Sequence, residues 1–150
     1  MSTVKDIFER KQKAFNTIQA DALVIEALSL LNSINLSYVV VEENGEYKGI
    51  FSERDYARNI VLKGRSSSNT KVKDAMTTDL PMVDVKDTVK HCMHLMNMHK
   101  TRYLLAYENN HFMGVVTIHD LLRQALISSD YEQDGIASSL LDNDEKTRFF

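Results

Sequence analysis

The stretch GIFSERDYAR, residues 49–58, is repeated in outline as GVVTIHDLLR, residues 114–123. Both copies read glycine, two apolar residues, a hydroxyl residue, two variable residues, aspartate, two further residues and arginine. The offset between them is 65 residues, and it aligns residues 22–58 with residues 87–123 without a gap. A fixed internal offset indicates one structural unit that is used twice. The fold is therefore expected to be an internal duplication.

Each unit has the pattern of the same five elements, in the order β-α-β-β-α, which predicts an α+β fold of the α/β type. Short extended pieces at 15–18 and 80–85 precede a helix with apolar residues at helical spacing. An apolar strand starts at Tyr38 or Tyr103, and a turn rich in Asn and Gly leads into an antiparallel second strand. The second helix starts at the hydroxyl residue of the repeated motif. The apolar stripes of the first helices are Val24, Ala27, Leu28 and Leu31 in one copy and Val89, Cys92, Met93 and Met96 in the other.

The chain divides into two repeats, a linker and a tail. The first repeat is residues 3–63, the linker 64–70, the second repeat 71–128 and the tail 129–150. The triplet VKD occurs in both repeats, at 4–6 and at 72–74, with an offset of 68 residues. The linker is polar and rich in serine, and the tail has so little apolar content that it predicts a fraying helix or a disordered end. One short sheet with two helices buries too little apolar surface alone, so the two repeats are expected to face each other.

Composition narrows the class of protein. A net charge of −3 gives no basic surface of the kind that binds nucleic acid or an anionic membrane. No run approaches the roughly 18 apolar residues of a membrane span, and the N-terminus lacks the apolar segment of a secretion signal. The single cysteine, Cys92, excludes an internal disulfide and fits a reducing compartment. A cytoplasmic location is expected.

This organisation resembles the tandem cystathionine-β-synthase (CBS) domain pair, or Bateman module, over residues 3–128. The first repeat carries the resemblance in TVKDIF, ALVIEALSLL and YVVVEENGEYKGIFSERD. The second repeat carries it in KVKDAMTT, VDVKDTVKHCMHLM and TRYLLAYENNHFMGVVTIHD. The strongest marker is Gly-apolar-apolar-[Ser/Thr]-x-x-Asp, present twice. The resemblance implies a stand-alone CBS-pair protein, with repeats related by a pseudo-twofold axis, that forms a disc-shaped homodimer.

In this family the marker motif holds the ribose of an adenosine nucleotide, which implies ribose contacts at Ser52, Asp55, Thr117 and Asp120. A nucleotide also needs cations for its phosphate and an apolar slot for its base. The phosphate candidates are Arg54, Arg102 and His119, and the adenine candidates are Ile18, Tyr38, Val83 and Tyr103. Solvated surface charge is the alternative for the cations, and core packing is the alternative for the apolar side chains. His119 stands where the family often has glycine, which narrows the second site.

The spacing of the motif has a competing explanation. A Ser or Thr at a helix start, followed three residues later by an acid, is also the pattern of a capping box. A duplicated cap would repeat as faithfully as a duplicated binding site. The capping box prefers Glu or Gln, whereas both copies have Asp, and a carboxylate can accept hydrogen bonds from both hydroxyls of a ribose. The sequence leaves open whether Asp55 and Asp120 face a ribose, their own helices, or both.

Other chemistry-bearing residues do not form a recognisable catalytic or metal site. His91 and His94 share a helix face, but they fall outside the apolar stripe, so surface histidines are expected and no metal site is predicted. No nucleophile with a base and no Gly-rich phosphate loop is present, which predicts a protein that is not an enzyme. An acid–base pair of His119 and Asp120 is the remote alternative.

The sequence therefore predicts a non-enzymatic regulatory module without a catalytic cofactor. It would bind an adenine nucleotide, such as AMP, ADP or ATP, in clefts between the two repeats and would signal to a separate effector protein. NAD(H) and S-adenosylmethionine remain possible ligands. The alternative is a constitutive interaction scaffold whose nucleotide clefts are vestigial.

Overall fold

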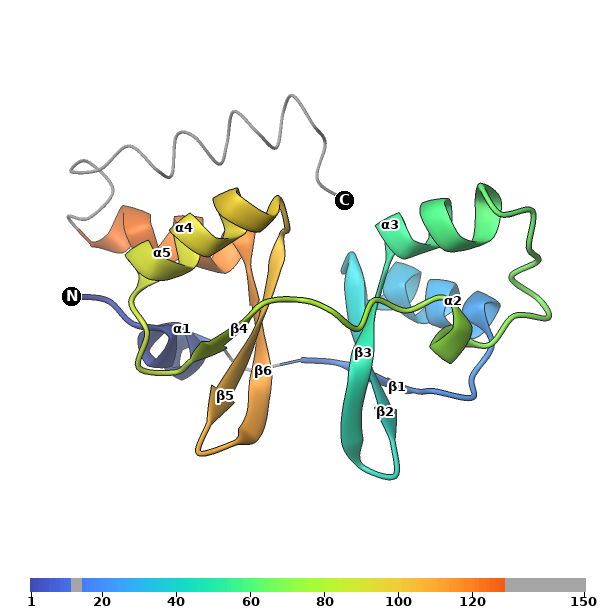
Figure 1. The fold of residues 1–150 in the computed structure, drawn as a ribbon, viewed down its shortest axis with the longest axis horizontal. Coiled ribbons are helices and arrows are strands. Elements are labelled where there is room, and N and C mark those ends of the chain that lie inside the picture. The colour runs from blue at the N-terminus through green and yellow to red at the C-terminus, as the bar shows by residue number, and fades with distance from the viewer. Residues whose placement is uncertain (12–14, 129–150) are drawn as a thin grey trace. The chain divides into compact units, whose positions relative to one another are not determined.

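The computed structural model describes residues 1–11 and 15–128, which form two compact units (Figure 1). One unit consists of residues 15–79, and the other of residues 1–11 together with 80–128. Within these described residues there are two three-stranded sheets and five α-helices. The mixed α+β class and the duplicated unit expected from the sequence are confirmed. The predicted tail, 129–150, lies outside the described residues.

The unit of residues 15–79 is built on one sheet in the order β1-β2-β3. Its elements are β1 (Thr17–Gln19), α2 (Val24–Ile34), β2 (Tyr38–Glu43), β3 (Glu46–Ser52), α3 (Glu53–Asp55), a π-helical segment (Tyr56–Val61) and a 3-10 turn (Val72–Asp74). β1 runs parallel to β2, and β2 pairs antiparallel with β3. The second helix predicted here is thus a single α-helical turn that continues as a π-helix. Nothing in the sequence, such as a proline or glycine, marked that change.

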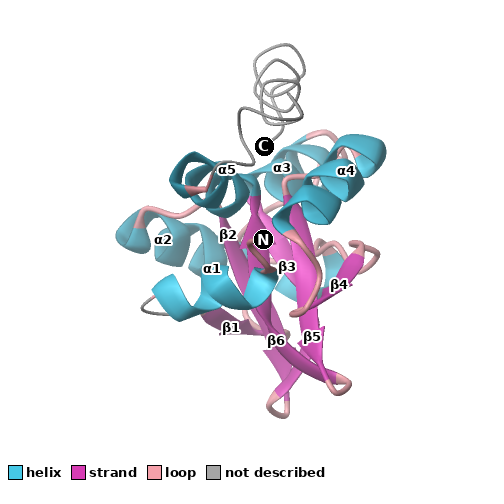
Figure 2. Cartoon of the chain, turned by 90° about the vertical axis from the view of Figure 1, so that its left-hand side faces the viewer, coloured by secondary structure: helices cyan, strands magenta, loops and turns pink. Residues whose placement is uncertain are grey.

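The second unit repeats this arrangement on the sheet β4-β5-β6. Its elements are α1 (Val4–Arg10), β4 (Met82–Asp84), α4 (Val89–His99), β5 (Tyr103–Glu108), β6 (His111–Thr117) and α5 (Ile118–Ile127). β4 runs parallel to β5, and β5 pairs antiparallel with β6. Helices α4 and α5 lie toward the end of the β5–β6 hairpin that is away from its turn (Figure 2). This end of the hairpin carries the second copy of the repeated motif.

The two hairpin turns follow from residues that tolerate left-handed backbone. Asn44 and Gly45 have φ values of 54° and 78°, and Asn109 and Asn110 have values of 49° and 65°. Positive φ at both central residues is the requirement of a type I′ turn, the two-residue turn whose twist matches a hairpin. These residues therefore fix the antiparallel return of β3 and β6, as predicted.

The VKD triplets join each compact unit to the neighbouring repeat of the sequence. The amides of Val4 and Lys5 donate to the carbonyls of Asp87 and Val85, at 3.0 and 2.9 Å. The amides of Val72 and Lys73 donate in the same way to Ala22 and Ala20, at 2.8 and 3.1 Å. Each triplet thus packs with the repeat other than the one it precedes in the sequence. Compact units and sequence repeats are different divisions of the chain, and α1 is an element that sequence reasoning missed.

The buried face of α4 is the stripe predicted from the sequence. Val89, Cys92, Met93 and Met96 are all buried, whereas His91 and His94 are exposed. Burial raises the pKa of the Cys92 thiol to about 12, so this residue stays protonated and acts as a small apolar side chain. In the described part of the chain, no three His, Cys, Asp or Glu side chains gather as a metal site would require. No described helix is long and apolar enough to cross a bilayer.

Candidate functional site

The two motif copies occupy equivalent positions, where a strand ends and a helix begins. In the cross-strand register, Ser52 lies opposite Tyr38 and Thr117 lies opposite Tyr103. The first helical amide after the hydroxyl residue donates back to the neighbouring strand in both units, from Glu53 to Ser37 at 3.0 Å and from Ile118 to Arg102 at 2.9 Å. The backbone therefore presents both aspartates in the same way.

Asp55 caps its own helix. Its Oδ2 accepts hydrogen bonds from the backbone amide of Ser52 at 2.9 Å and from the Ser52 hydroxyl at 3.0 Å. The Ser52 hydroxyl in turn accepts the amide proton of Asp55 at 3.3 Å. The residue is only 5% exposed. The capping reading of the motif is thus confirmed for this copy, and it engages one oxygen of the carboxylate.

The other oxygen of Asp55 faces a segment from outside the helix. Its Oδ1 accepts a hydrogen bond from the hydroxyl of Thr77, which follows the 3-10 turn. Thr77 is held there by two backbone hydrogen bonds with Ile50, of 2.9 and 2.8 Å. All of these partners are uncharged, and burial raises the pKa of the Asp55 carboxyl above its ordinary value, although the Thr77 and Ser52 hydrogen bonds oppose that shift.

Gly49 permits this close approach of the Thr77 segment. A Cβ at this position would lie 2.8 Å from Sδ of Met76 and 2.8 Å from the carbonyl oxygen of Thr77. Such distances are shorter than side-chain contacts in folded proteins allow, so only glycine leaves the crossing undisturbed. The glycine of this motif copy is therefore explained by the backbone that passes over it.

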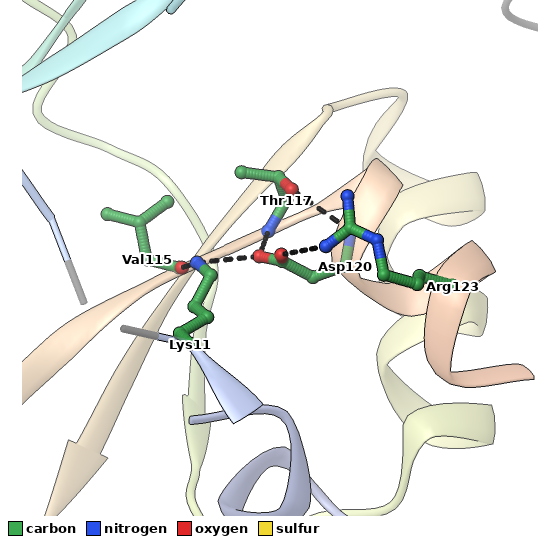
Figure 3. Close-up of polar contacts among 5 residues, drawn as sticks. All are labelled: Lys11, Val115, Thr117, Asp120 and Arg123. Carbon is green, nitrogen blue, oxygen red and sulfur yellow. Dashed lines mark hydrogen bonds and ion pairs between the residues drawn. The ribbon is translucent and has the colours of Figure 1, made fainter. Parts of the chain in front are cut away.

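Asp120 forms the same cap but has different outer partners (Figure 3). Its Oδ2 accepts the Thr117 amide at 2.9 Å, and its own amide donates to the Thr117 hydroxyl at 3.1 Å. The ammonium of Lys11 lies 2.7 Å from the same Oδ2 and also donates to the carbonyl of Val115 at 2.9 Å. The guanidinium of Arg123 lies 3.7 Å from Oδ1. Here the carboxylate is neutralised by cations.

A third capping box shows what the spacing does by itself. At the start of α1, Oδ2 of Asp6 accepts the Thr3 amide at 2.9 Å and the Thr3 hydroxyl at 3.3 Å. This copy has neither the glycine nor the preceding hairpin of the repeated motif. A hydroxyl residue followed by Asp three positions later is therefore sufficient to cap a helix in this chain.

Two of the cations predicted to bind phosphate are brought together. Nη2 of Arg102 lies 3.0 Å from Nε2 of His119, and Arg102 is 8% exposed. A guanidinium has only donors, so the imidazole nitrogen must be the acceptor and His119 is neutral in this contact. Arg54 is half-buried next to Asp55 and contributes, as the smallest cause, an electrostatic lowering of the pKa of that carboxyl. Their role toward phosphate stays a prediction.

The four predicted adenine contacts fall into two groups. Tyr38 and Tyr103 are buried beside the hydroxyl residues of the motifs. Ile18 and Val83 pair with Val41 and Ala106, three positions further along the central strands, which is roughly 10 Å away. Val83 belongs to the core of its unit and Ile18 packs against the core of the other. Core packing accounts for these two, while the tyrosines lie where a base could reach them.

A cavity of about 180 Å³ lies beside Asp120, between α1 and α5. It is lined by Ile7, Arg10, Lys11, Asp120, Arg123, Gln124 and Ile127. Three of these side chains are cationic and one is anionic, so the lining carries an excess of positive charge.

A model of the CBS domain matches residues 4–62 and 72–126 of this chain. The chain belongs to the CBS domain family. The mitochondrial CBS domain-containing protein CBSX3 of Arabidopsis thaliana is 31% identical over 131 residues, which cover 81% of this chain and 64% of the plant protein. The chain therefore spans somewhat less than two thirds of the length of this relative.

Solved structures of CBS proteins have the same fold. The CBS-domain protein ATU1752 of Agrobacterium tumefaciens superposes with a TM-score of 0.75 at 28% identity, over 81% of this chain and 92% of that one. CBSX2, solved in complex with AMP, superposes with a TM-score of 0.69 at 23% identity, over 85% of this chain and 98% of that one. At this identity the second likeness establishes a shared fold.

Sequence reasoning missed the two residues that contact the motif carboxylates from outside their helices, Thr77 and Lys11. The available signal was the repeated VKD triplet, because each contact residue lies a few positions after one triplet. The triplets differ in offset from the rest of this CBS pair, so no simple alignment placed Lys11 and Thr77 at corresponding sites.

Proposed function

We propose that this CBS pair is a regulatory module that binds an adenine nucleotide, with AMP as the first candidate, through a ribose contact at Asp55. The observation that carries the proposal is the division of labour within the Asp55 carboxylate. One oxygen caps the helix, and the other accepts a hydroxyl from a separate segment, Thr77. A hydroxyl-accepting carboxylate oxygen is the group that a ribose requires.

The chemistry of the exchange supports this assignment. A ribose hydroxyl that replaced the Thr77 hydroxyl would leave Asp55 with the same type of donor, so neither the cap nor the charge would be disturbed. A buried carboxylate with only uncharged partners is costly to keep ionised, and such perturbed groups cluster at functional sites. Tyr38 lies opposite Ser52 for a base, and Arg54 adjoins Asp55 for a phosphate. The AMP complex of CBSX2 supports the choice of ligand.

Calorimetric titration with AMP and with 2′-deoxy-AMP tests the ribose contact without altering the protein. Loss of one hydrogen bond to a charged group costs about 1.5–3 kcal/mol, so the deoxy ligand should bind roughly tenfold to a hundredfold more weakly. Equal affinity for the two ligands would overturn the ribose contact.

A protein variant gives an independent test. Asp55→Asn removes the charge that strengthens the ribose hydrogen bonds and should weaken AMP binding, while keeping an oxygen for the cap. Asp6→Asn is the matched control, since it changes the same type of capping box at a position remote from the motif. A similar loss of AMP affinity in both variants would show that Asp55 acts only through stability.

The wider function follows from the ligand. The nucleotide would stabilise the module by mass action, and an effector protein would respond to that state. The non-enzymatic role, the homodimer, the cytoplasmic location and the separate effector remain part of this proposal. Absence of any thermal stabilisation by adenine nucleotides at millimolar concentration would favour the interaction scaffold instead.

A further inference from the structure

The two motif carboxylates differ in the group that reaches them from outside their helices. Thr77 brings a neutral hydroxyl to Asp55, whereas Lys11 brings an ammonium to Asp120. Both groups come from segments that follow a VKD triplet, and both contact a carboxylate that is almost fully buried. The cap is conserved between the copies, so this outer partner is the main difference at the aspartate itself.

Replacing these outer partners by a ribose has different consequences in the two copies. At Asp55 one hydroxyl donor would be exchanged for another. At Asp120 the exchange would break an ion pair and would leave a largely buried ammonium without its counter-charge, a strongly unfavourable outcome. The Lys11 side chain is only 16% exposed, so water offers it little compensation.

Lys11 is also held in place by contacts other than the ion pair. Its ammonium donates to the carbonyl of Val115 on β6 at 2.9 Å and lies 5.7 Å from the centre of the Phe8 ring (Figure 3 shows the first of these). On the other carboxylate oxygen, Arg123 adds a second cation at 3.7 Å. A ribose diol offers donors to a carboxylate, and here both oxygens already face stronger donors.

We propose that Lys11 is a specificity-determining residue that closes the Asp120 motif to a ribose diol, so that each chain holds one adenine nucleotide, at Asp55. This inference rests on the proposed function of the Asp55 motif. It predicts unequal use of two copies whose sequence motifs alone would predict two equal sites.

Lys11→Thr tests the inference because it gives the second motif the type of outer partner that the first one has. Calorimetry with AMP should give one site per chain for the wild type and two for Lys11→Thr. Asp55→Asn should remove the single wild-type site, and Asp120→Asn should leave it. In the Lys11→Thr background, Asp120→Asn should remove the added site. Arg10→Thr is the matched control, since it removes a neighbouring positive charge that has no ion pair with Asp120, and it should leave one site.

The outcomes separate this inference from the proposal on which it rests. Two sites in the wild type, or one site in a folded Lys11→Thr variant, would overturn the role of Lys11. If Lys11→Thr does not fold, Lys11→Met removes the charge while it keeps the apolar stem, and it is expected to give the same second site. Binding to Lys11→Thr at Asp120 without any binding to the wild type would support the role of Lys11 and overturn the Asp55 site. No AMP binding to either protein would overturn both.

Discussion

Asp55 and Asp120 end the same strand-to-helix turn with the same cap, yet they lie in opposite electrostatic surroundings. Asp55 has hydroxyl and amide partners, while Asp120 has an ammonium at 2.7 Å and a guanidinium at 3.7 Å. The capping hydrogen bonds are local and depend on four consecutive residues, so a duplication preserves them. The outer partners come from distant segments and can diverge without any change in the motif. A repeated motif therefore does not imply a repeated site.

The motif glycines make the same point. Gly49 lies under the Thr77 segment, where a Cβ would meet a backbone carbonyl oxygen at 2.8 Å. Gly114 has a φ of 151°, a backbone conformation that residues with a side chain rarely adopt. One glycine is thus explained by a close approach and the other by its own backbone.

Removing the charge of Lys11 should have the largest effect on stability. Lys11→Met leaves Asp120 buried without its nearest cation, and we expect a loss of about 2–4 kcal/mol in the free energy of unfolding. Urea denaturation followed by circular dichroism measures it. The double variant Lys11→Met/Asp120→Asn should recover most of that loss, because no uncompensated charge remains. A single variant as stable as the wild type would show that the ion pair is not what balances Asp120.

Much of the fold could be predicted because its determinants are local. The apolar stripe of α4, the Asn44-Gly45 turn and the hydroxyl–Asp spacing each lie within a few residues, and each gave the observed element. The π-helical segment was missed because no residue in it disfavours an ordinary α-helix. Helix α1 was missed because its apolar face is short.

The candidate site was only partly predictable, for a different reason. Lys11 is 109 residues from Asp120 in the sequence, and Thr77 is 22 residues from Asp55. Such contacts depend on how segments pack, which a motif does not encode. Arg102 and His119 were both assigned to phosphate from their closeness to the motif, and the structure adds that they are hydrogen-bonded to each other. Each of these partners became visible only once the chain was folded.

Crowding at Gly49 should have the next largest effect. Gly49→Ala would push the Thr77 carbonyl and the Met76 side chain away from β3, and we expect a loss of about 1–3 kcal/mol in the free energy of unfolding. Gly64→Ala is a useful comparison, because a Cβ there meets nothing within 4 Å and only the positive φ of 65° is strained. AMP affinity should also change in Gly49→Ala but not in Gly64→Ala. Equal effects on binding would contradict a specific role for the Thr77 crossing.

Removing the Thr77 hydroxyl should have a smaller effect. Thr77→Val takes one donor from Oδ1 of Asp55, and we expect a loss of about 1–2 kcal/mol in the free energy of unfolding. Thr78→Val, at the exposed neighbouring threonine, is the control and should change stability little. If the two variants are equally stable, the Thr77 hydrogen bond contributes nothing measurable, and the contrast between the two motifs then rests on Lys11 alone.

The smallest effect is a difference in how stability depends on pH. Burial raises the pKa of Asp55 in the folded state, so between its unfolded and folded pKa values the folded protein binds the proton more tightly. The contribution of Asp55 to stability is therefore fully present below the unfolded pKa and is lost as pH rises through the folded pKa, by at most about 1.4 kcal/mol per pH unit. Urea denaturation at several pH values should show the wild type losing stability relative to Asp55→Asn as pH increases. Asp21 gives the opposite sign, because its hydrogen bond with Lys73 lowers its pKa, and its contribution is lost as pH falls. A stability difference between the wild type and Asp55→Asn that does not change with pH would mean that the Asp55 carboxylate is no harder to ionise in the folded protein than in the unfolded chain.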